Sequence, residues 1–546
     1  MSPVALLLSL TLAPPVQFTK PAQHGPLLDK AAAIFTRRVA ARCGPSTAKP
    51  VTLDLRVQPG PTSGAYTISS HGAALRVTGQ DEAGVLYGLG KLFRTSSCDN
   101  GAFRPGAWRG SSAPAGTLRG VYLASHFGNF YEAAPISELE TYVEDLALWG
   151  VNAIGFAFPN WQYDSYDDPA AQANLARLRA MMAVARASGI RVGAMVAPNQ
   201  VFRSAPAELR AKPYPDDWGR RGNLGTNLCP SLPAARHYIL NAWSRLLDEY
   251  KATGLDFVVY WPYDEGGCGC SQCWPWGSRG FYRISRDMTE LARRRYPQLQ
   301  TVLSTWMFDT PPAGEWRELS DNLEKDAPWI HYIMADAHED FPRYPLDYEV
   351  PGRLPLVNFP EISMWGQSPW GGYGANPLPA RLQMLWDQIK AKVRGGLPYS
   401  EGIYEDLNKI IATQFYWDPN TTAAATVREY IASEFSPAVV PEVTQAITIL
   451  EANHSRRGNG SFRSPPRETA QARALMEAAN AKLPPQIQSA WRWRILYLRA
   501  LIDHELAKSG GVPKREALAQ PFAELIRIYH AGHVHTNKVA PPALRE

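Results

Sequence analysis

The sequence lacks a long apolar run, a long basic run and the short motifs of nucleotide-binding proteins and of H-E-x-x-H zinc proteases. No stretch reaches the roughly 18 consecutive apolar residues that a membrane-spanning helix requires. The 56 basic residues are interspersed with 51 acidic ones, so the net charge of +5 over 546 residues predicts no nucleic-acid partner. No G-x-G-x-x-G or phosphate loop follows the first strand of the predicted central region, which argues against a nucleotide-binding fold.

The amino terminus contains one short apolar stretch, from Val4 to Ala13. No Lys or Arg precedes it, and Pro14 and Pro15 follow it. Its length is typical of a secretory signal, so we expect residues 1–15 to be a signal segment and the protein to be secreted or periplasmic. Six cysteines are compatible with disulfides but do not demand them. In an exported protein, Cys43 and Cys98 are expected to pair.

The composition is that of a globular protein with several domains. Hydrophobic residues make up 45% of the chain and aromatic residues 11%. Aromatic side chains usually belong to cores, but they also line sugar sites, where a flat ring stacks on a pyranose. A chain of 546 residues is expected to contain more than one domain.

Residues 16–115 are predicted to form an α+β accessory domain. LLDKAAAIFTRRVAARC has helical spacing, whereas VTLDLRV, AYTISS and ALRVTG alternate as strands do. DEAGVLYGLGKLFR begins with acids and continues with helical spacing. The segment from Asn100 to Gly116 is rich in Gly, Pro, Ser and Ala, and is expected to be a linker.

Residues 116–417 are predicted to form a barrel. Eight apolar strand-like runs, from GVYLASHF to GGLPYSEGIYED, alternate there with amphipathic helices. This pattern predicts an α/β fold with a (β/α)8 barrel, and a doubly wound sheet would usually need fewer strands. Residues 418–546 show only helical spacing and are predicted to be a helical C-terminal domain.

Acids follow several predicted strands at the place where active sites of such barrels form. Asp264 and Glu265 follow FVVYWPY, Asp336 ends the sixth strand, and Glu361 follows the seventh. Glycoside hydrolysis needs one carboxylic acid to protonate the leaving oxygen and a second group as nucleophile or as base for water. Crowded carboxylates raise the pKa of one member and keep it protonated. We therefore predict catalytic roles for these four residues, although such acids elsewhere often cap helices or lie in solvated loops.

Further residues at the strand ends are candidates for substrate binding. They are Trp161, Asn199, Arg203, Tyr263, Trp306, Trp365 and Glu401. Glu401 forms a group with Glu405 and Asp406, for which capping of the next helix is the alternative interpretation.

Cys268, Cys270 and Cys273 form a C-x-C-x-x-C pattern directly after the acid pair, and Cys229 lies at the end of another loop. Four thiolates would make a structural zinc site. A disulfide within the loops and free thiols are the alternatives. In each case the cysteines are expected to brace the loop that presents Glu265, and no cofactor is expected for catalysis.

The run AYTISSHGAALRVTGQDEAGVLYGLGKLFR resembles the accessory domain that precedes the barrel in family-20 β-hexosaminidases, family-84 enzymes and family-67 α-glucuronidases. The hexosaminidase pattern implies that Glu265 is the general acid and that Asp264 orients a substrate acetamido group, which attacks the anomeric carbon. This sequence has W-P-Y-D-E where that family has H-x-G-G-D-E. The α-glucuronidase pattern implies that Glu265 is the acid and that Asp336 and Glu361 activate water.

These observations predict an exo-acting glycoside hydrolase whose substrate is an oligosaccharide or a glycoconjugate. A carbohydrate-binding protein without turnover and a metal-dependent hydrolase are the alternatives. The sequence does not specify the sugar, the linkage or the oligomeric state.

Overall fold

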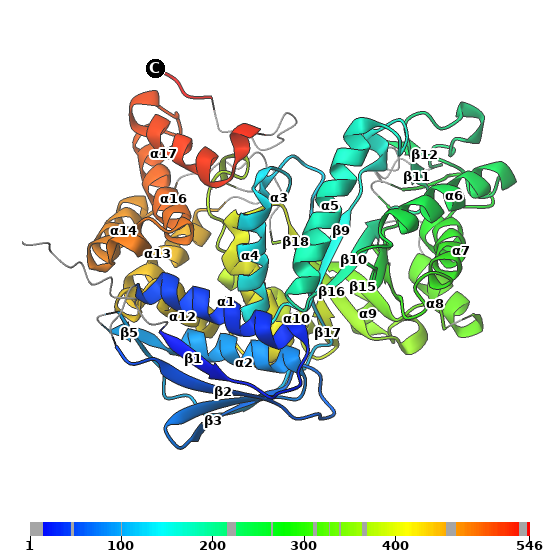
Figure 1. The fold of residues 1–546 in the computed structure, drawn as a ribbon. Helices are drawn as coiled ribbons and strands as arrows, with labels where there is room; N and C mark the ends of the chain where they lie inside the picture. The colour runs from blue at the N-terminus through cyan, green and yellow to red at the C-terminus, as the bar shows by residue number, and fades with distance from the viewer. Residues whose placement is uncertain are drawn as a thin grey trace, which may run out of the picture.

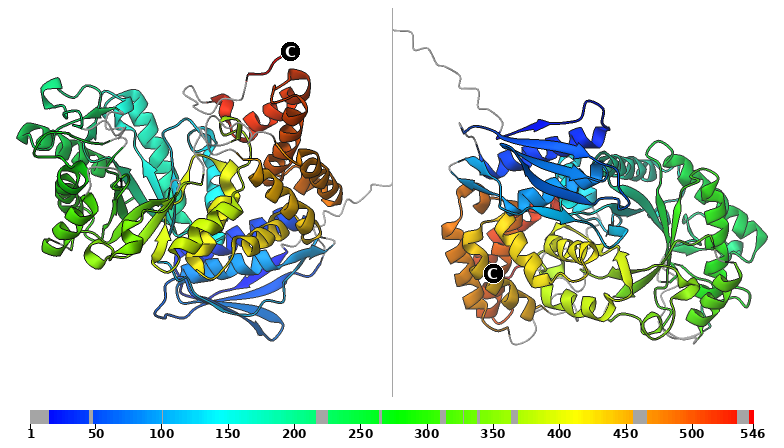
Figure 2. Two further views of the ribbon diagram at one scale, coloured as in Figure 1. Left: turned by 180° about the vertical axis from the view of Figure 1, so that it is seen from behind. Right: turned by 90° about the horizontal axis from the view of Figure 1, so that it is seen from below.

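The protein was analysed as a computed structural model, which describes residues 15–44, 48–99, 101–215, 225–263, 266–309, 314–326, 328–337, 340–362, 369–454, 466–533 and 543–546. The chain forms an N-terminal sheet with two helices, a central barrel and a set of C-terminal helices (Figure 1). The sheet and the C-terminal helices lie on the same side of the barrel (Figure 2).

The N-terminal part is a five-stranded mixed sheet in the order β1-β2-β4-β3-β7. Its strands are β1 (Val16–Thr19), β2 (Val51–Val57), β3 (Tyr66–His71), β4 (Ala74–Gly79) and β7 (Gly110–Ser112). A separate hairpin consists of β5 (Ser97–Asp99) and β6 (Ala102–Arg104). The prediction of a linker from Asn100 to Gly116 was therefore wrong in part, because β7 pairs with β3 and extends the sheet.

Two helices cover one face of this sheet, α1 (Pro26–Cys43) and α2 (Glu82–Thr95). Cys43 at the end of α1 forms a disulfide with Cys98, as expected. α2 packs against a barrel helix at a close approach that only glycine allows. A Cβ atom at Gly90 would lie 1.9 Å from the carbonyl oxygen of Leu148.

Eight parallel strands close into a barrel, and this confirms the predicted fold class. The order is β8-β9-β10-β13-β14-β15-β16-β17, and β17 pairs back with β8. The strands are β8 (Leu118–Leu123), β9 (Ala153–Ala157), β10 (Arg191–Val196), β13 (Phe257–Tyr260), β14 (Gln300–Ser304), β15 (Tyr332–Ala337), β16 (Leu356–Pro360) and β17 (Val393–Gly396). The short strand β18 (Tyr399–Ser400) continues β17 and also pairs with β8.

Helices follow the barrel strands in turn. They are α3 (Phe130–Ala133), α4 (Ile136–Leu148), α5 (Pro169–Ala187), α6 (Pro233–Glu249), α7 (Tyr282–Arg293), α8 (Glu315–Lys325), α9 (Tyr344–Asp347), α10 (Pro379–Ile389) and α11 (Asp406–Trp417). The loop between β10 and α6 also carries a small hairpin, β11 (Gln200–Val201) and β12 (Thr226–Asn227).

Side chains from alternate strand positions fill the barrel interior, because successive residues of a strand point to opposite faces. On β13 the inward residues are Phe257 and Val259, and on β15 they are Tyr332 and Met334. The other strands contribute Leu118, Tyr122, Ala124, Ala153, Ala157, Met195, Val302, Val357, Phe359 and Leu397. The interior is therefore a packed core, and a substrate can reach only the mouth.

The C-terminal part is helical, as predicted. Its helices are α12 (Ala423–Glu434), α13 (Val440–Ala452), α14 (Thr469–Lys482), α15 (Pro485–Gln488), α16 (Trp491–Lys508) and α17 (Arg515–Ile528). Among the helices that the structure describes, none has the length and apolar character needed to cross a membrane.

A buried ionic network joins the three parts of the chain. Arg492 of α16 binds Asp145 of α4 and Asp406 of α11, each at 2.8 Å. Arg38 of α1 also binds Asp145, at 3.0 Å, and reaches Glu434 of α12 at 2.9 Å. Burial opposes the charge of Arg492, but the surrounding carboxylates outweigh it and raise its pKa. The network therefore keeps its charges and cross-links the accessory helix, the barrel and the C-terminal helices.

We predict that Arg492→Met lowers the free energy of unfolding by about 3–5 kcal/mol, because it leaves buried carboxylates without their cation. The matched control is Arg494→Met on the same helix. Arg494 pairs with Glu524 at 2.5 Å, and both side chains are partly exposed, so the loss should be about 1 kcal/mol or less. Urea unfolding measures both variants, and equal losses would contradict the role of the network.

Candidate active site at the barrel mouth

Three acids converge on the carboxyl end of the barrel. Asp336 follows the inward residue Met334 by two positions, and Glu361 follows Phe359 by two. Both carboxylates therefore continue the inward face of adjacent strands, β15 and β16. Glu401 follows Tyr399 by two positions and lies on the same side of the chain, because the Tyr399 hydroxyl donates to its carboxylate at 2.5 Å. Two of the four predicted catalytic residues, Asp336 and Glu361, thus face the mouth.

Four aromatic rings cap the barrel core beneath these acids, and we call them the aromatic floor: Tyr122, Trp261, Phe359 and Tyr399. Phe359 lies at the centre, with ring centroids 4.9 Å from Trp261, 6.0 Å from Tyr122 and 5.9 Å from Tyr399. Glu361 is in register with Tyr399, which is in register with Tyr122. The floor therefore lies directly beside carboxylates, an arrangement suited to a sugar ring, and its half-buried members are Trp261 and Tyr399.

The acids differ in their access to solvent. Glu361 is 3% exposed and Glu401 is 1% exposed, whereas Asp336 is half-buried. Burial raises the pKa of Tyr399 well above its usual value, and the neighbouring Glu401 carboxylate raises it further. Tyr399 therefore stays protonated and holds Glu401 by donating its hydrogen bond.

Two predicted tryptophans flank the floor. Trp306 stacks on Trp261 with ring centroids 5.4 Å apart. Trp161 lies edge-on to His126 at 5.6 Å, and His126 stacks on Tyr122 at 6.1 Å. Both tryptophans are half-buried.

Two predicted binding residues instead hold the loop after β13. The Asn199 amide donates to the carbonyl oxygens of Leu228 and Gly267 and accepts from the Gly267 N–H at 3.0 Å. The Tyr263 hydroxyl donates to Glu315 at 2.5 Å. Neither Asn199 nor Tyr263 has exposed surface, so in this structure they position the loop.

The remaining predicted residues fall into two groups. Arg203 is exposed and pairs with Asp164 at 3.2 Å. Asp264, Glu265 and Trp365 lie outside the described residues.

Glu405 beside this site caps the short 3-10 helix Ile403–Glu405 and makes no side-chain cap bond to α11. Its carboxylate accepts the Gly402 N–H at 3.2 Å ahead of α11 and lies 3.9 Å from the Lys409 ammonium. Burial raises the pKa of Glu405 to about 7 and lowers the pKa of Lys409 to about 8. The Lys409 ammonium also donates to Tyr142 at 2.8 Å, so this buried pair fixes the rim of the mouth to α4.

The raised pKa of Glu405 predicts a pH dependence of stability. Between pH 4.5 and about 7, the folded protein holds a proton that the unfolded chain releases. Stability therefore falls as the pH rises through this window. Glu405→Gln removes this pH-dependent contribution. Between pH 5 and pH 7, the free energy of unfolding of the wild type should therefore fall by on the order of 2 kcal/mol relative to that of the variant.

Urea unfolding at the two pH values measures this effect, and Glu429→Gln is its control. Burial opposes the charge of Glu429, but Arg94 and Lys91 outweigh it and lower its pKa. The difference in free energy of unfolding between the wild type and this control should therefore be the same at pH 5 and at pH 7. An unchanged pH dependence in Glu405→Gln would contradict the assignment.

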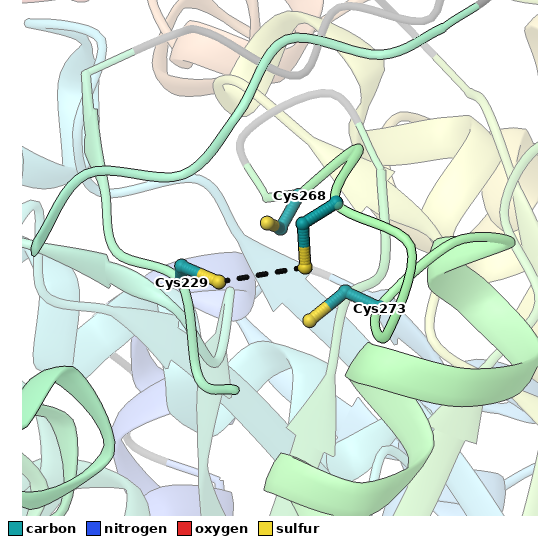
Figure 3. Close-up of side chains that lie close together, drawn as sticks. Cys229, Cys268 and Cys273 are labelled. Atoms are coloured by element: carbon teal, nitrogen blue, oxygen red, sulfur yellow. Dashed lines mark hydrogen bonds between the residues drawn. The ribbon is translucent and has the colours of Figure 1, made fainter. Parts of the chain in front are cut away.

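The four predicted cysteines come together beside the loop after β13. Their sulfur atoms all lie within 4.8 Å of one another. Figure 3 shows the side chains of Cys229, Cys268 and Cys273 pointing toward a common centre. Cys270 completes the group, with its sulfur 3.6 Å from that of Cys229.

No protein-family model matches the chain, and no curated protein matches it in sequence. Comparison of structures finds proteins with a similar fold. A family GH115 4-O-methyl-α-glucuronidase with specificity for decorated arabinogalactans matches with a TM-score of 0.61 and 12% identity, over 96% of this chain and 77% of that one. A family 20 β-N-acetylglucosaminidase matches with a TM-score of 0.53 and 15% identity, over 76% of this chain and 92% of that one.

A third similar structure is the family 89 enzyme of Clostridium perfringens in complex with GlcNAc-α-1,4-galactose. It has a TM-score of 0.61 and 10% identity, over 92% of this chain and 64% of that one. These identities support a statement about fold alone. The chain has a fold that glycoside hydrolases of several families share, and the predicted resemblance to that group is confirmed at this level.

The aromatic floor was not among the residues predicted from the sequence. The alternation of side chains along a strand indicates its position, because Trp261 follows the inward residue Val259 by two positions. Counting inward positions on every strand would have placed Trp261 in the mouth and Tyr260 outside the barrel.

Proposed function

We propose that the protein is an exo-acting glycosidase whose active site is the mouth of the barrel. The observation that carries this proposal is the convergence of Asp336, Glu361 and Glu401 above the aromatic floor. Carboxylates in such a site stabilise the positive charge that develops on the sugar in the transition state. The glycosidases that share the fold support the same activity.

The residues of the mouth have separate roles in this proposal. Glu265 is the general acid that protonates the leaving oxygen, and Asp264 orients the substrate or tunes the pKa of Glu265. Asp336 and Glu361 act on water or stabilise the transition state. Activation of water by these two acids is the route proposed here, and attack by a substrate acetamido group is the alternative. Carboxyl groups alone carry this chemistry, so no catalytic cofactor is required.

The aromatic rings supply binding. Trp261 and Trp306 form a stacked pair at the edge of the floor, and both are half-buried. Because Trp261 also packs against Phe359, which precedes Glu361 by two positions, the pair lies on the acid-bearing side of the mouth. The disulfide between Cys43 and Cys98 supports secretion or export to the periplasm, where such bonds persist.

Hydrolysis of a panel of aryl glycosides tests the activity. The panel contains N-acetyl-β-glucosaminide, N-acetyl-β-galactosaminide, α-glucuronide and the common neutral sugars. We expect turnover of one member and a loss of about 10²- to 10⁴-fold in kcat for Glu265→Gln, because the general acid is removed. Glu208→Gln, an exposed glutamate on a neighbouring loop, is the control and should keep full activity.

The outcomes separate the mechanisms. Water activation predicts a product of inverted configuration and large losses in Asp336→Asn and Glu361→Gln. A retained configuration, with turnover of acetamido sugars only, would instead favour the substrate-assisted route. Full activity of Glu265→Gln would exclude that residue as the acid. Saturable sugar binding without turnover of any member would mean that the protein only binds carbohydrate.

The stacking role predicts a different signature. Trp261→Ala should raise KM by about 5- to 10-fold, with a smaller effect on kcat, because ring contacts to the substrate are lost. Trp108→Ala removes a half-buried tryptophan from the accessory region and should leave KM unchanged. Equal effects of the two substitutions would contradict a role of Trp261 in binding.

A further inference from the structure

The four-cysteine cluster is separate from the chemistry of the mouth. Cys229 lies in the loop between β12 and α6, whereas Cys268, Cys270 and Cys273 lie in the loop after β13. Three of the four are buried, and Cys270 is half-buried. The cluster therefore joins two neighbouring loops of the barrel (Figure 3), and the Ser231 hydroxyl lies 2.9 Å from the Cys229 sulfur and 3.4 Å from the Cys270 sulfur.

The spacing of the sulfur atoms fits one metal ion. A tetrahedral zinc site with Zn–S bonds of about 2.3 Å has its sulfur atoms about 3.8 Å apart. The pair Cys229 and Cys270 lies at 3.6 Å, and all pairs fall within 4.8 Å. A disulfide would bring two sulfur atoms to about 2.0 Å, and none of these four cysteines is joined in that way.

The oxidation state of the chain supports the same conclusion. Cys43 and Cys98 form a disulfide, whereas the four clustered cysteines are free. Thiols packed this closely would oxidise to disulfides under conditions that form the first bond, unless a metal held them as thiolates.

Glycines set the backbone conformation of the second loop. A Cβ atom at Gly269 would lie 1.9 Å from the carbonyl oxygen of Pro213, and one at Gly267 would lie 1.6 Å from the Tyr214 hydroxyl. The Gly269 N–H donates to Lys212 at 2.8 Å. Asn199 binds both the N–H and the carbonyl of Gly267. The glycines of GGCGC thus let the loop lie flat against residues 212–214 with its sulfur atoms turned toward Cys229.

We propose that Cys229, Cys268, Cys270 and Cys273 bind one zinc ion as a structural tetrathiolate site. With four protein ligands the ion has no open position, so it takes no part in hydrolysis. Zinc binding displaces the thiol protons, and the four sulfur atoms become its ligands. The ion cross-links the loops after β12 and β13. Cys268 follows Glu265 by three residues, so, on the proposed function, the ion also braces the segment that carries the general acid.

The metal content of the purified full-length chain tests this proposal without reference to activity. Elemental analysis should find about one zinc per chain, and modification of the thiols with a mercurial reagent should release it. Cys229→Ser and Cys270→Ser should lose the zinc. The matched control is the double variant Cys43→Ser with Cys98→Ser, which removes the disulfide and should keep one zinc per chain.

Cobalt provides a second readout in case a cysteine variant fails to fold. Wild-type protein reconstituted with Co²⁺ should show the intense visible absorption of a tetrahedral cobalt–thiolate site. Iron in place of zinc, protein that stays metal-free after reconstitution under reducing conditions, or two disulfides among the four cysteines by mass spectrometry would each overturn the proposal. Zinc binding by a chain that hydrolyses no glycoside would leave the metal site standing and contradict only the proposed function.

Discussion

Closure of the eight-stranded barrel is the constraint on which the rest of the structure depends. Parallel strands in a fixed register must send alternate side chains inward, and in this chain those side chains fill the interior completely. On β15 and β16, the inward-facing positions therefore continue to Asp336 and Glu361 at the mouth, and the barrel encloses no pore. The packed core ends in aromatic rings at the mouth, and the acids follow there. The same alternation of side chains also places the Trp261 ring beside the Phe359 ring.

The other parts of the chain hold this mouth in place. The ionic network around Arg492 ties the start of α11 to α4 and α16, while Glu405 and Lys409 tie the rim to the barrel wall. Such buried charges contribute little net stability when they are paired, but each becomes costly when its partner is lost. They therefore fix the positions of the helices that carry the rim. On the opposite rim, hydrogen bonds from Asn199 and the cysteine cluster do the same for the loop after β13.

The sequence predicted the fold class because periodicity alone separates barrel strands from helices, and the eight runs all became strands. It placed Asp336 and Glu361 at strand ends for the same reason. It could not show that Tyr263 is buried against Glu315, because that contact joins residues 52 positions apart in the chain. It also assigned Gly110–Ser112 to a linker, since a short glycine- and serine-rich edge strand has no hydrophobic alternation to reveal it. The grouping of the cysteines was predicted from spacing, but their common centre needed the fold.

The central claim is that the barrel mouth binds and hydrolyses a sugar on the aromatic floor. The most direct measurement is a crystal structure of the protein soaked with N-acetylglucosamine and glucuronic acid together. We expect one pyranose ring to lie against Trp261 and Trp306, with hydroxyl groups within hydrogen-bond distance of Asp336 or Glu361. A sugar bound only against the accessory sheet or the C-terminal helices, with the mouth empty, would contradict the account.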